Sequence, residues 1–371
     1  GVVTGGNDRS LSANTTDAEE SGTNHANSNL IDFTSTGFIA DANGGGASVN
    51  GIVGVTYVYI AIRRPDSYVG KPAKVGTDVF AMDTGTQGNG EIPCFDSGFT
   101  VDYGLVRQPA STHNWFSGSR LTGDRYMYTD LTNSQAQWTA MVWDSNVGFI
   151  KNQPSSYQAW MWKRHAGFDV VTYKGNSTAG HAIPHSLNKI PEMIWIKKRD
   201  GSPNYAWRVF HKDLNNGVDA YQWMLELNDN APENGGNIWF NQMPTSTHFT
   251  VKTSATTNAS GVNYIAMLFA SVTGISKVGS YSGSNSSQQI SLGFQPRFLI
   301  IKNINDARNW QVLDTTRGWG SGNDCRLFMD LNESQICTSD VGAPTSTGFT
   351  LTGGNQRWSI AGDTYVYYAH A

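Results

Sequence analysis

The chain repeats itself along its length. Four stretches share one pattern, in which a turn leads into a strand containing phenylalanine, and a loop then leads into a strand that begins with tyrosine: residues 35–60, 147–160, 246–267 and 346–368. Successive copies lie roughly 100 residues apart, which is too long for a solenoid unit and about the size of one small domain. The chain is therefore a string of similar modules, and its function has to be sought in the array.

The repeat extends upstream of this pattern. Residues 191–197 align with residues 296–302, and in both copies a polar turn then leads into a strand headed by Trp207 or Trp310. Trp115 stands at the same place in the preceding module. We therefore predict that the complete modules share one fold. The prolines that open the two aligned stretches should mark equivalent strand entries, and Trp207 and Trp310 should fill equivalent core positions.

The first copy of the pattern begins halfway through a module. Residues 10–16 match the strand ends at 225–228 and 329–332, and nothing before them corresponds to the front strands. Half a sandwich cannot cover its own sheet. We therefore expect that Gly1 is not the natural start, that upstream sequence completes this sandwich, and that residues 1–64 are protease-sensitive without it. The alternative is a degenerate repeat that pairs with a neighbour.

The composition is that of an all-β protein. Only 15% of the residues are charged, whereas 12% are aromatic and 40 are glycine, as in proteins built from short strands and many turns. The net charge of -4 argues against nucleic-acid partners, which require basic surfaces. No apolar stretch approaches the roughly 20 residues of a membrane-spanning helix, so we expect no membrane insertion.

The strand pattern predicts tandem antiparallel β-sandwich modules of the jelly-roll type, with about seven or eight short strands each and no convincing helix. We place a rear half-repeat at residues 1–64, a linker at 65–77, and complete β-sandwich repeats at 78–165, 166–272 and 273–371. The junctions after the linker are short. We therefore expect the modules to form a stiff rod.

Some predicted strands are apolar on both faces, as at residues 194–196 and 265–269. An antiparallel strand of this kind needs cover on its outer side as well as its inner side. The cover can come from a loop, from a neighbouring module or from another subunit. A homo-oligomer agrees with the pattern, and so does cover within one module.

Cys94, Cys325 and Cys337 are too few to link three domains, and their odd number leaves at least one unpaired. Cys325 and Cys337 could form a bridge within the last module, but the other modules have no equivalent cysteines. We therefore predict free, buried thiols, as in a protein that folds in a reducing cytosol.

No catalytic set stands out, and we predict no catalytic residue, no metal site and no cofactor. His211 is absent from the corresponding stretch of the last module, where Asp314 stands, so a structural histidine is the better interpretation. The acidic stretch at residues 228–234 offers oxygen ligands of the calcium type. It lacks the spacing of a calcium loop, and we interpret it as a solvated turn.

Three tryptophans are candidates for weak ligand binding. Trp319 lies in a glycine-rich loop, where an exposed ring could stack on a sugar. Trp160 and Trp162 alternate on one face of a predicted strand and could do the same. The other interpretation is that Trp160 and Trp162 fill a core or a subunit interface, which we prefer. For Trp319 both interpretations stay open.

The repeated pattern resembles a β-sandwich module of uncharacterised function found in structural, tail fibre-like proteins of marine tailed bacteriophages. The residues that carry the resemblance are 168–176, 279–283, 296–302, 309–310, 346–349 and 362–367. It covers the last two modules well, the second module loosely and the first only in its rear half. In the second module, residues 160–164 replace the usual small-residue ending.

The resemblance implies a virion component that is assembled in the cytoplasm of a bacterial host. With the array, it predicts a non-enzymatic virion structural protein, in the first place a tail fibre or comparable host-contacting appendage with a scaffold and receptor-adhesion role. The expected partners are other virion proteins, copies of the same chain and a glycan of the host surface. The alternatives are a lectin-like carbohydrate-binding module that uses loop aromatics, a capsid decoration protein and, less in keeping with the residues, an enzyme such as a depolymerase.

Overall fold

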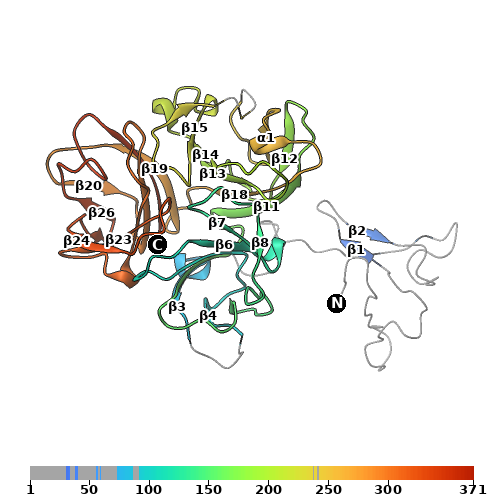
Figure 1. The fold of residues 1–371 in the computed structure, drawn as a ribbon, viewed down its shortest axis with the longest axis horizontal. Coiled ribbons are helices and arrows are strands. Elements are labelled where there is room, and N and C mark those ends of the chain that lie inside the picture. The colour runs from blue at the N-terminus through green and yellow to red at the C-terminus, as the bar shows by residue number, and fades with distance from the viewer. Residues whose placement is uncertain are drawn as a thin grey trace. The chain divides into compact units, whose positions relative to one another are not determined.

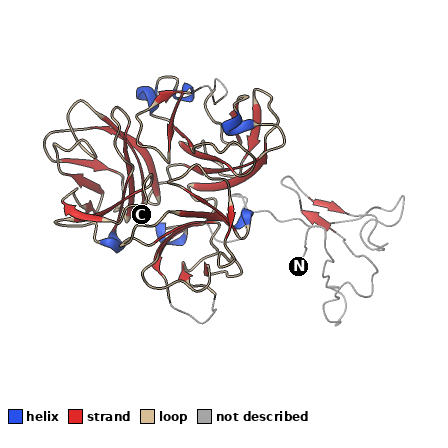
Figure 2. Ribbon diagram, viewed as in Figure 1, coloured by secondary structure: helices blue, strands red, loops and turns tan. Residues whose placement is uncertain are grey.

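The computed structural model describes residues 31–33, 38–40, 56, 59, 73–86, 92–236, 238–239 and 242–371. The chain divides into two compact units, Gly1–Val69 and Gly70–Ala371, which are treated separately below. The regular structure of the described part is almost entirely antiparallel strand, connected by loops and a few short helices (Figure 2), and the predicted all-β sandwich fold is confirmed.

In the first unit, β1 (Ile31–Phe33) pairs with β2 (Phe38–Ala40), and Phe33 lies opposite Phe38. The last module has a hairpin with the same register at the same place in the repeat, because Pro344 lies opposite Phe349. The strand pairing thus agrees with the sequence repeat. The strands expected near residues 11 and 57, and with them the prediction of an incomplete sandwich, lie outside the described residues.

The second unit contains three six-stranded sheets, each formed by one continuous stretch of chain. We call the stretches module A (residues 73–165), module B (166–272) and module C (273–371). Module A forms its sheet in the order β3 (Phe80–Thr84), β10 (Gln158–Trp162), β5 (Tyr103–Arg107), β6 (Phe116–Ser119), β7 (Arg125–Tyr128) and β8 (Ala136–Gln137). A smaller sheet pairs β4 (Phe95–Asp96) with β9 (Gly148–Phe149).

Modules B and C repeat this order. In module B it is β11 (Phe168–Lys174), β18 (Asn263–Phe269), β13 (Met193–Lys198), β14 (Arg208–His211), β15 (Trp223–Glu226) and β16 (Asn234–Gly235), with a small sheet of β12 (His181–Pro184) and β17 (His248–Val251). In module C it is β19 (Ser276–Ser282), β27 (Thr364–His370), β21 (Phe298–Asn303), β22 (Gln311–Asp314), β23 (Asp324–Phe328) and β24 (Ile336–Ser339), with a small sheet of β20 (Gln288–Ser291), β26 (Gly348–Leu351) and β25 (Pro344–Thr345). Each large sheet lies wholly within one predicted repeat.

In the part of the chain that the structure describes, helices are short and occur only in connections. They are η1 (Gly76–Asp78), η2 (Arg120–Thr122), η3 (Leu214–Gly217), η4 (Ala220–Gln222), η5 (Thr315–Arg317) and α1 (Ala255–Asn258). Within the residues that the structure describes, no helix has the length and apolar character needed to cross a membrane.

Strand register matches the three modules residue by residue in their central strand pairs. Trp162, Phe269 and His370 lie opposite Tyr103, Met193 and Phe298, respectively, in the central strand pairs. In modules B and C, Pro191 and Pro296 each stand two residues before the central strand. The predicted equivalence of these strand entries is therefore confirmed.

The three modules do not form the predicted rod. Their large sheets face a common centre, around which the cyan-green, yellow-green and orange-red parts of residues 73–371 gather in Figure 1, and one hydrophobic core includes side chains from all three. Trp162 of module A lies 5.7 Å from Phe298 of module C, and Phe269 of module B lies 4.8 Å from Tyr368 of module C, measured between ring centroids. Short junctions here bend the array into a closed cluster.

The two-faced apolar strands explain this closure. In β21, Leu299 and Ile301 belong to a core inside module C, whereas Phe298 and Ile300 belong to the core shared by the three modules. Burying both faces stabilises the fold at roughly 25 cal/mol per Å² of apolar surface. A straight rod would leave the second face in water. Neighbouring modules of the same chain therefore supply the outer cover for these strands.

The cysteine prediction is wrong for one pair. Cys325 and Cys337 form a disulfide that joins β23 to β24, and their Cα atoms are 4.0 Å apart. Antiparallel pairing of these two strands places the residues side by side, a relation that the repeat could not reveal because the other modules lack these cysteines. Cys94 is free and buried, and its Sγ lies 3.1 Å from the carbonyl oxygens of Thr86 and Gln153.

A candidate ligand groove at the junction of modules B and C

Three equivalent junctions connect the modules in a cycle. At each, a buried tryptophan indole donates a hydrogen bond to a main-chain carbonyl of the next module. The pairs are Trp310 to Glu226 at 2.9 Å, Trp207 to Tyr128 at 2.8 Å and Trp115 to Phe328 at 2.7 Å. The bonds run from module C to B, from B to A and from A to C. The predicted equivalence of Trp207 and Trp310 is thus confirmed, and its role is to join modules.

The tryptophans are also fixed within their own modules. Their main-chain N–H groups donate to the side-chain oxygens of Asp130, Asn228 and Asp330, over 3.1, 2.7 and 3.0 Å respectively. These acceptors stand two residues after the carbonyls that receive the indoles. One strand end therefore holds the tryptophan of its own module and that of a neighbour, because its side chain and its carbonyl point to different partners. This accounts for the repeated polar strand end seen in the sequence.

A buried cation reinforces each junction. Lys302 donates from Nζ to the carbonyl of Asn230 at 3.1 Å, and Lys197 donates likewise to Thr132 at 2.7 Å. Arg107 donates from Nη1 to Leu331 at 2.6 Å. Burial lowers the pKa of Lys302 to about 8 and that of Lys197 to about 7, since removal from water disfavours the charged form.

Main-chain bonds complete the same pattern. Glu233 donates to Ile304 at 2.9 Å, Gln135 donates to Arg199 at 2.8 Å, and Gln335 donates to Pro109 at 2.7 Å. Each donor lies in the loop after the strand that receives the indole. The three junctions are therefore copies of one interface that closes on itself, and differences between the copies mark what the interface itself does not require.

The B–C junction carries the candidate site, a hollow of about 660 Å³ between the loop that holds Asn230 and two loops of module C. We call it the B–C groove. Its polar lining consists of Asn230, Arg308, Asn309, Asn355, Gln356 and Arg357, and its remaining lining of Ala307, Gly354 and Ile360. The groove thus presents four amides and two guanidinium groups, and no carboxylate is present among the described residues that line it.

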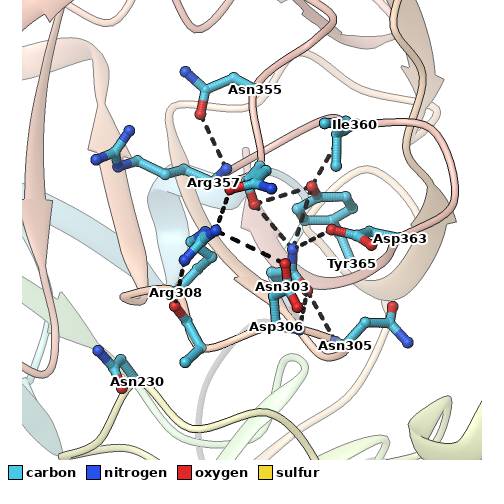
Figure 3. A network of polar contacts seen from close by, with 12 residues as sticks. Asn230, Asn303, Asn305, Asp306, Arg308, Asn355, Arg357, Ile360, Asp363 and Tyr365 are labelled. Atoms are coloured by element: carbon cyan, nitrogen blue, oxygen red, sulfur yellow. Dashed lines mark hydrogen bonds and ion pairs between the residues drawn. The ribbon is translucent and has the colours of Figure 1, made fainter.

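A buried amide holds the two loops of module C in place (Figure 3). Asn303 donates from Nδ2 to the carbonyl of Gln356 at 2.9 Å and to Asp363 Oδ2 at 2.8 Å. Its Oδ1 accepts from the main-chain N–H of Asn305 at 2.8 Å. Tyr365 donates from Oη to the same Gln356 carbonyl at 3.0 Å. The groove wall is therefore supported from inside the protein and does not depend on a ligand for its shape.

The two arginines differ in how they are held. Arg308 donates to the side-chain oxygen of Gln356 and, at 2.9 Å, to the carbonyl of Ala307, and its Nη2 lies 3.8 Å from Asp306 Oδ2. Arg357 is exposed, and no hydrogen bond or ion pair holds its guanidinium among the described residues (Figure 3). Its charge further lowers the pKa of Arg326, which is lowered mainly by burial. One guanidinium is thus oriented, and the other is free to meet a ligand.

The equivalent positions at the A–B junction have no arginines. Tyr264 of module B donates to the carbonyl of Ala255 as Tyr365 does to that of Gln356, which places Thr256 at the position of Arg357. Counting back from the equivalent tryptophans places Tyr205 at the position of Arg308. The ring centroid of Tyr205 lies 4.9 Å from Lys198 Nζ. Both junctions close, so the arginines are dispensable for joining modules.

The A–C junction has a shorter counterpart to this wall. The connection from β9 to β10 in module A covers residues 150–157, whereas the connection from β26 to β27 in module C covers 352–363. The longer connection supplies Asn355, Gln356 and Arg357 to the groove. The B–C groove therefore differs from both other copies of the junction.

The structure places the predicted sugar-stacking tryptophans inside the protein. Trp319 is 3% exposed, and its indole donates to the carbonyl of Gly342 at 2.9 Å. Trp160 and Trp162 are fully buried and donate to Asp314 Oδ2 at 3.0 Å and to Tyr368 Oη at 3.2 Å. The stacking role is corrected accordingly. The glycine-rich loop that holds Trp319 packs against the rest of its own module C. Trp160 and Trp162 fill the interface between modules A and C.

The other residues singled out from the sequence have structural contacts. His211 is buried, and this burial lowers its pKa. Asn228 in the acidic stretch holds the main-chain N–H of Trp207, while Asn230 of the same stretch borders the groove. Among the residues that the structure describes, no group of three or more histidine, cysteine or acidic side chains is arranged to bind a metal ion.

The sequence patterns did not identify Arg308 and Arg357 as candidate binding residues. Neither belongs to a motif, and they are 49 positions apart in the chain, so nothing local connects them. A signal was present in the alignment of modules, where arginine replaces Tyr205 and Thr256. A difference of that kind gains meaning only when the fold shows that both positions border the same hollow.

A family model described as a domain of unknown function (DUF7483) matches residues 117–371. No curated protein and no solved structure matches the chain. The match begins within β6 of module A and includes all of modules B and C, and hence every residue that lines the groove.

Proposed function

The chain belongs to the DUF7483 family of domains of unknown function, and from this premise we propose that it is a non-enzymatic structural protein of a bacteriophage virion. Within the particle, its proposed position is a tail fibre or comparable host-contacting appendage. It is assembled with other virion proteins in the cytoplasm of the bacterial host. Its role there is to present a rigid surface to the host.

The cyclic joining of modules A, B and C is the observation that carries this proposal. Each junction buries a tryptophan, a cation and a main-chain hydrogen bond, and one hydrophobic core unites the three modules. A protein that must transmit force, or hold a binding surface at a fixed orientation, benefits from such closure. The resemblance of the repeat to modules of phage structural proteins supports the same interpretation.

Host contact is supported by the position and chemistry of the B–C groove. Its amides and guanidinium groups are available at the surface, and they are the groups that pair with hydroxyls and anions. Because the A–B junction closes with Tyr205 and Thr256 at the positions of Arg308 and Arg357, the presence of these two arginines calls for a role other than assembly. Binding of a host-surface glycan is such a role.

Localisation in the particle tests the proposal. Antibodies raised against residues 70–371 should label purified virions of the phage that encodes the chain, and electron microscopy with gold-conjugated antibodies should place the label on the tail. Label on the capsid would instead favour a decoration protein. Absence of the chain from washed virions, shown by mass spectrometry, would contradict a structural role.

A further inference from the structure

We propose that the B–C groove binds a saccharide that carries carboxylate groups, with Arg308 and Arg357 pairing with these groups and the lining amides pairing with sugar hydroxyls. This inference rests on the proposed host-contact role only for the source of the saccharide. The groove and its chemistry stand independently of that role.

The volume and the lining both fit a small polar ligand. At about 660 Å³, the hollow lies within the range of roughly 300–1,000 Å³ typical of small-molecule sites. The absence of aromatic side chains from the described lining disfavours a neutral sugar, whose recognition usually uses a ring to stack on. It equally disfavours a nucleobase. Amides and guanidinium groups together match a ligand with hydroxyls and a planar anion.

The charges on the groove wall select for an anion. Two guanidinium groups line it without a carboxylate among the described lining residues, and Asp306 Oδ2 lies 3.8 Å from Arg308 Nη2. An exposed ion pair at that distance contributes little, so a ligand carboxylate can compete for Arg308. A planar carboxylate also suits the fork of a guanidinium, which can donate two parallel hydrogen bonds.

The site is preformed, which lowers the cost of binding. Asn303 fixes both loops of module C through hydrogen bonds, and Lys302 fixes the loop of Asn230 by donating to the main-chain carbonyl of that residue. The oriented Arg308 loses little further freedom when a ligand binds. Arg357 still has its side-chain freedom to lose, and we expect it to contribute mainly through charge.

The test uses the full chain and the residues that the A–B junction provides as built-in replacements. The variants are Arg308→Tyr, Arg357→Thr and the double variant, and Arg125→Thr is the control because it replaces a half-exposed arginine outside the groove. The probes are oligogalacturonate, which carries carboxylates, dextran, which is neutral, and dextran sulfate. Titration calorimetry gives the affinity, and thermal unfolding confirms that each variant is folded.

We expect oligogalacturonate to bind the parent chain and the Arg125→Thr variant equally. Each single groove variant should weaken binding by about tenfold, and the double variant by more, as expected for loss of a charge-assisted pair. Dextran should not bind. Failure of oligogalacturonate to bind, equal binding by all variants, or binding of dextran sulfate alone would each overturn the proposal. None of these outcomes alters where the chain lies in the virion, so the two proposals fail separately.

Discussion

The indole N–H of Trp310 in module C donates a hydrogen bond of 2.9 Å to the main-chain carbonyl of Glu226 in module B. The same bond occurs at both other junctions, so three tryptophans in equivalent positions bind three equivalent strand ends in a cycle. Because the three contacts are equivalent and the modules share one core, the relationship predicts how the array responds when one tryptophan is altered.

Two substitutions of Trp310 separate its volume from its hydrogen bond. Trp310→Ala empties a large buried site and should lower the free energy of unfolding by about 3–5 kcal/mol. Trp310→Phe keeps most of the volume but leaves the Glu226 carbonyl without its donor, and it should cost about 1–3 kcal/mol. Denaturant unfolding of the full chain gives both values. An unchanged midpoint for Trp310→Ala would show that the position is not part of a packed core.

The shared core predicts that modules A, B and C unfold together. Module C expressed alone as residues 273–371 would expose Phe298, Ile300 and Tyr368, which in the chain face the other modules. We therefore expect it to bind a hydrophobic dye or to associate, and to melt well below residues 70–371. An isolated module C that stays monomeric and melts at the same temperature would mean that the junctions contribute no stability.

Much of the fold follows from the sequence, because local pattern determines it. Repeat length, turn residues and aromatic strands predicted the all-β modules, and the alignment of Trp207 with Trp310 predicted their equivalence. Closure of the array was not predictable in the same way. Strands that are apolar on both faces, such as residues 194–196, indicated that their outer face is also covered. Which part of the protein covers it depends on how the short junctions bend.

The candidate site was harder to predict for a related reason. Trp319 lies in a glycine-rich loop, where stacking on a ligand and burial were both open interpretations, yet its loop folds inward, and composition alone cannot tell these outcomes apart. Arg308 and Arg357 are brought together only by the pairing of modules B and C. A groove between modules belongs to tertiary structure, and its residues carry no common sequence signal.

Reduction of the disulfide in module C should destabilise the joined modules as a whole. The bond between Cys325 and Cys337 closes a short loop, since the residues are 12 apart in sequence, and a loop of this length contributes about 2–3 kcal/mol in the chain-entropy description. Unfolding measured with and without reductant should show this loss. The double variant Cys325→Ser/Cys337→Ser is the control, and its stability should not respond to reductant. A response of equal size in that variant would assign the effect to another cause.

Acid should destabilise the fold through His370. Burial, with the nearby Arg297 guanidinium, lowers its pKa to about 3, whereas the unfolded chain protonates near the ordinary value of about 6.5. The unfolded state therefore binds more protons than the folded state between these two values. The part of the unfolding free energy that depends on neutral His370 is fully present above pH 6.5. It is lost as the pH falls towards 3, with a slope of at most about 1.4 kcal/mol per pH unit.

The repeat supplies the variant that tests this titration. Phe269 occupies the equivalent position in module B and is fully buried, so His370→Phe places a residue there that cannot be protonated. His211 shifts stability in the same direction as His370, and Asp330, whose pKa burial raises to about 7, shifts it in the opposite direction. Both groups are present in parent and variant, and the difference between the two chains isolates His370.

The variant should equal the parent near neutral pH and gain relative stability as the pH falls from 6.5 to 4 in denaturant unfolding. If the added volume beside Phe80 destabilises the variant, His370→Asn provides a smaller side chain that also does not titrate. Parallel pH profiles for parent and both variants would show that His370 is not the group responsible.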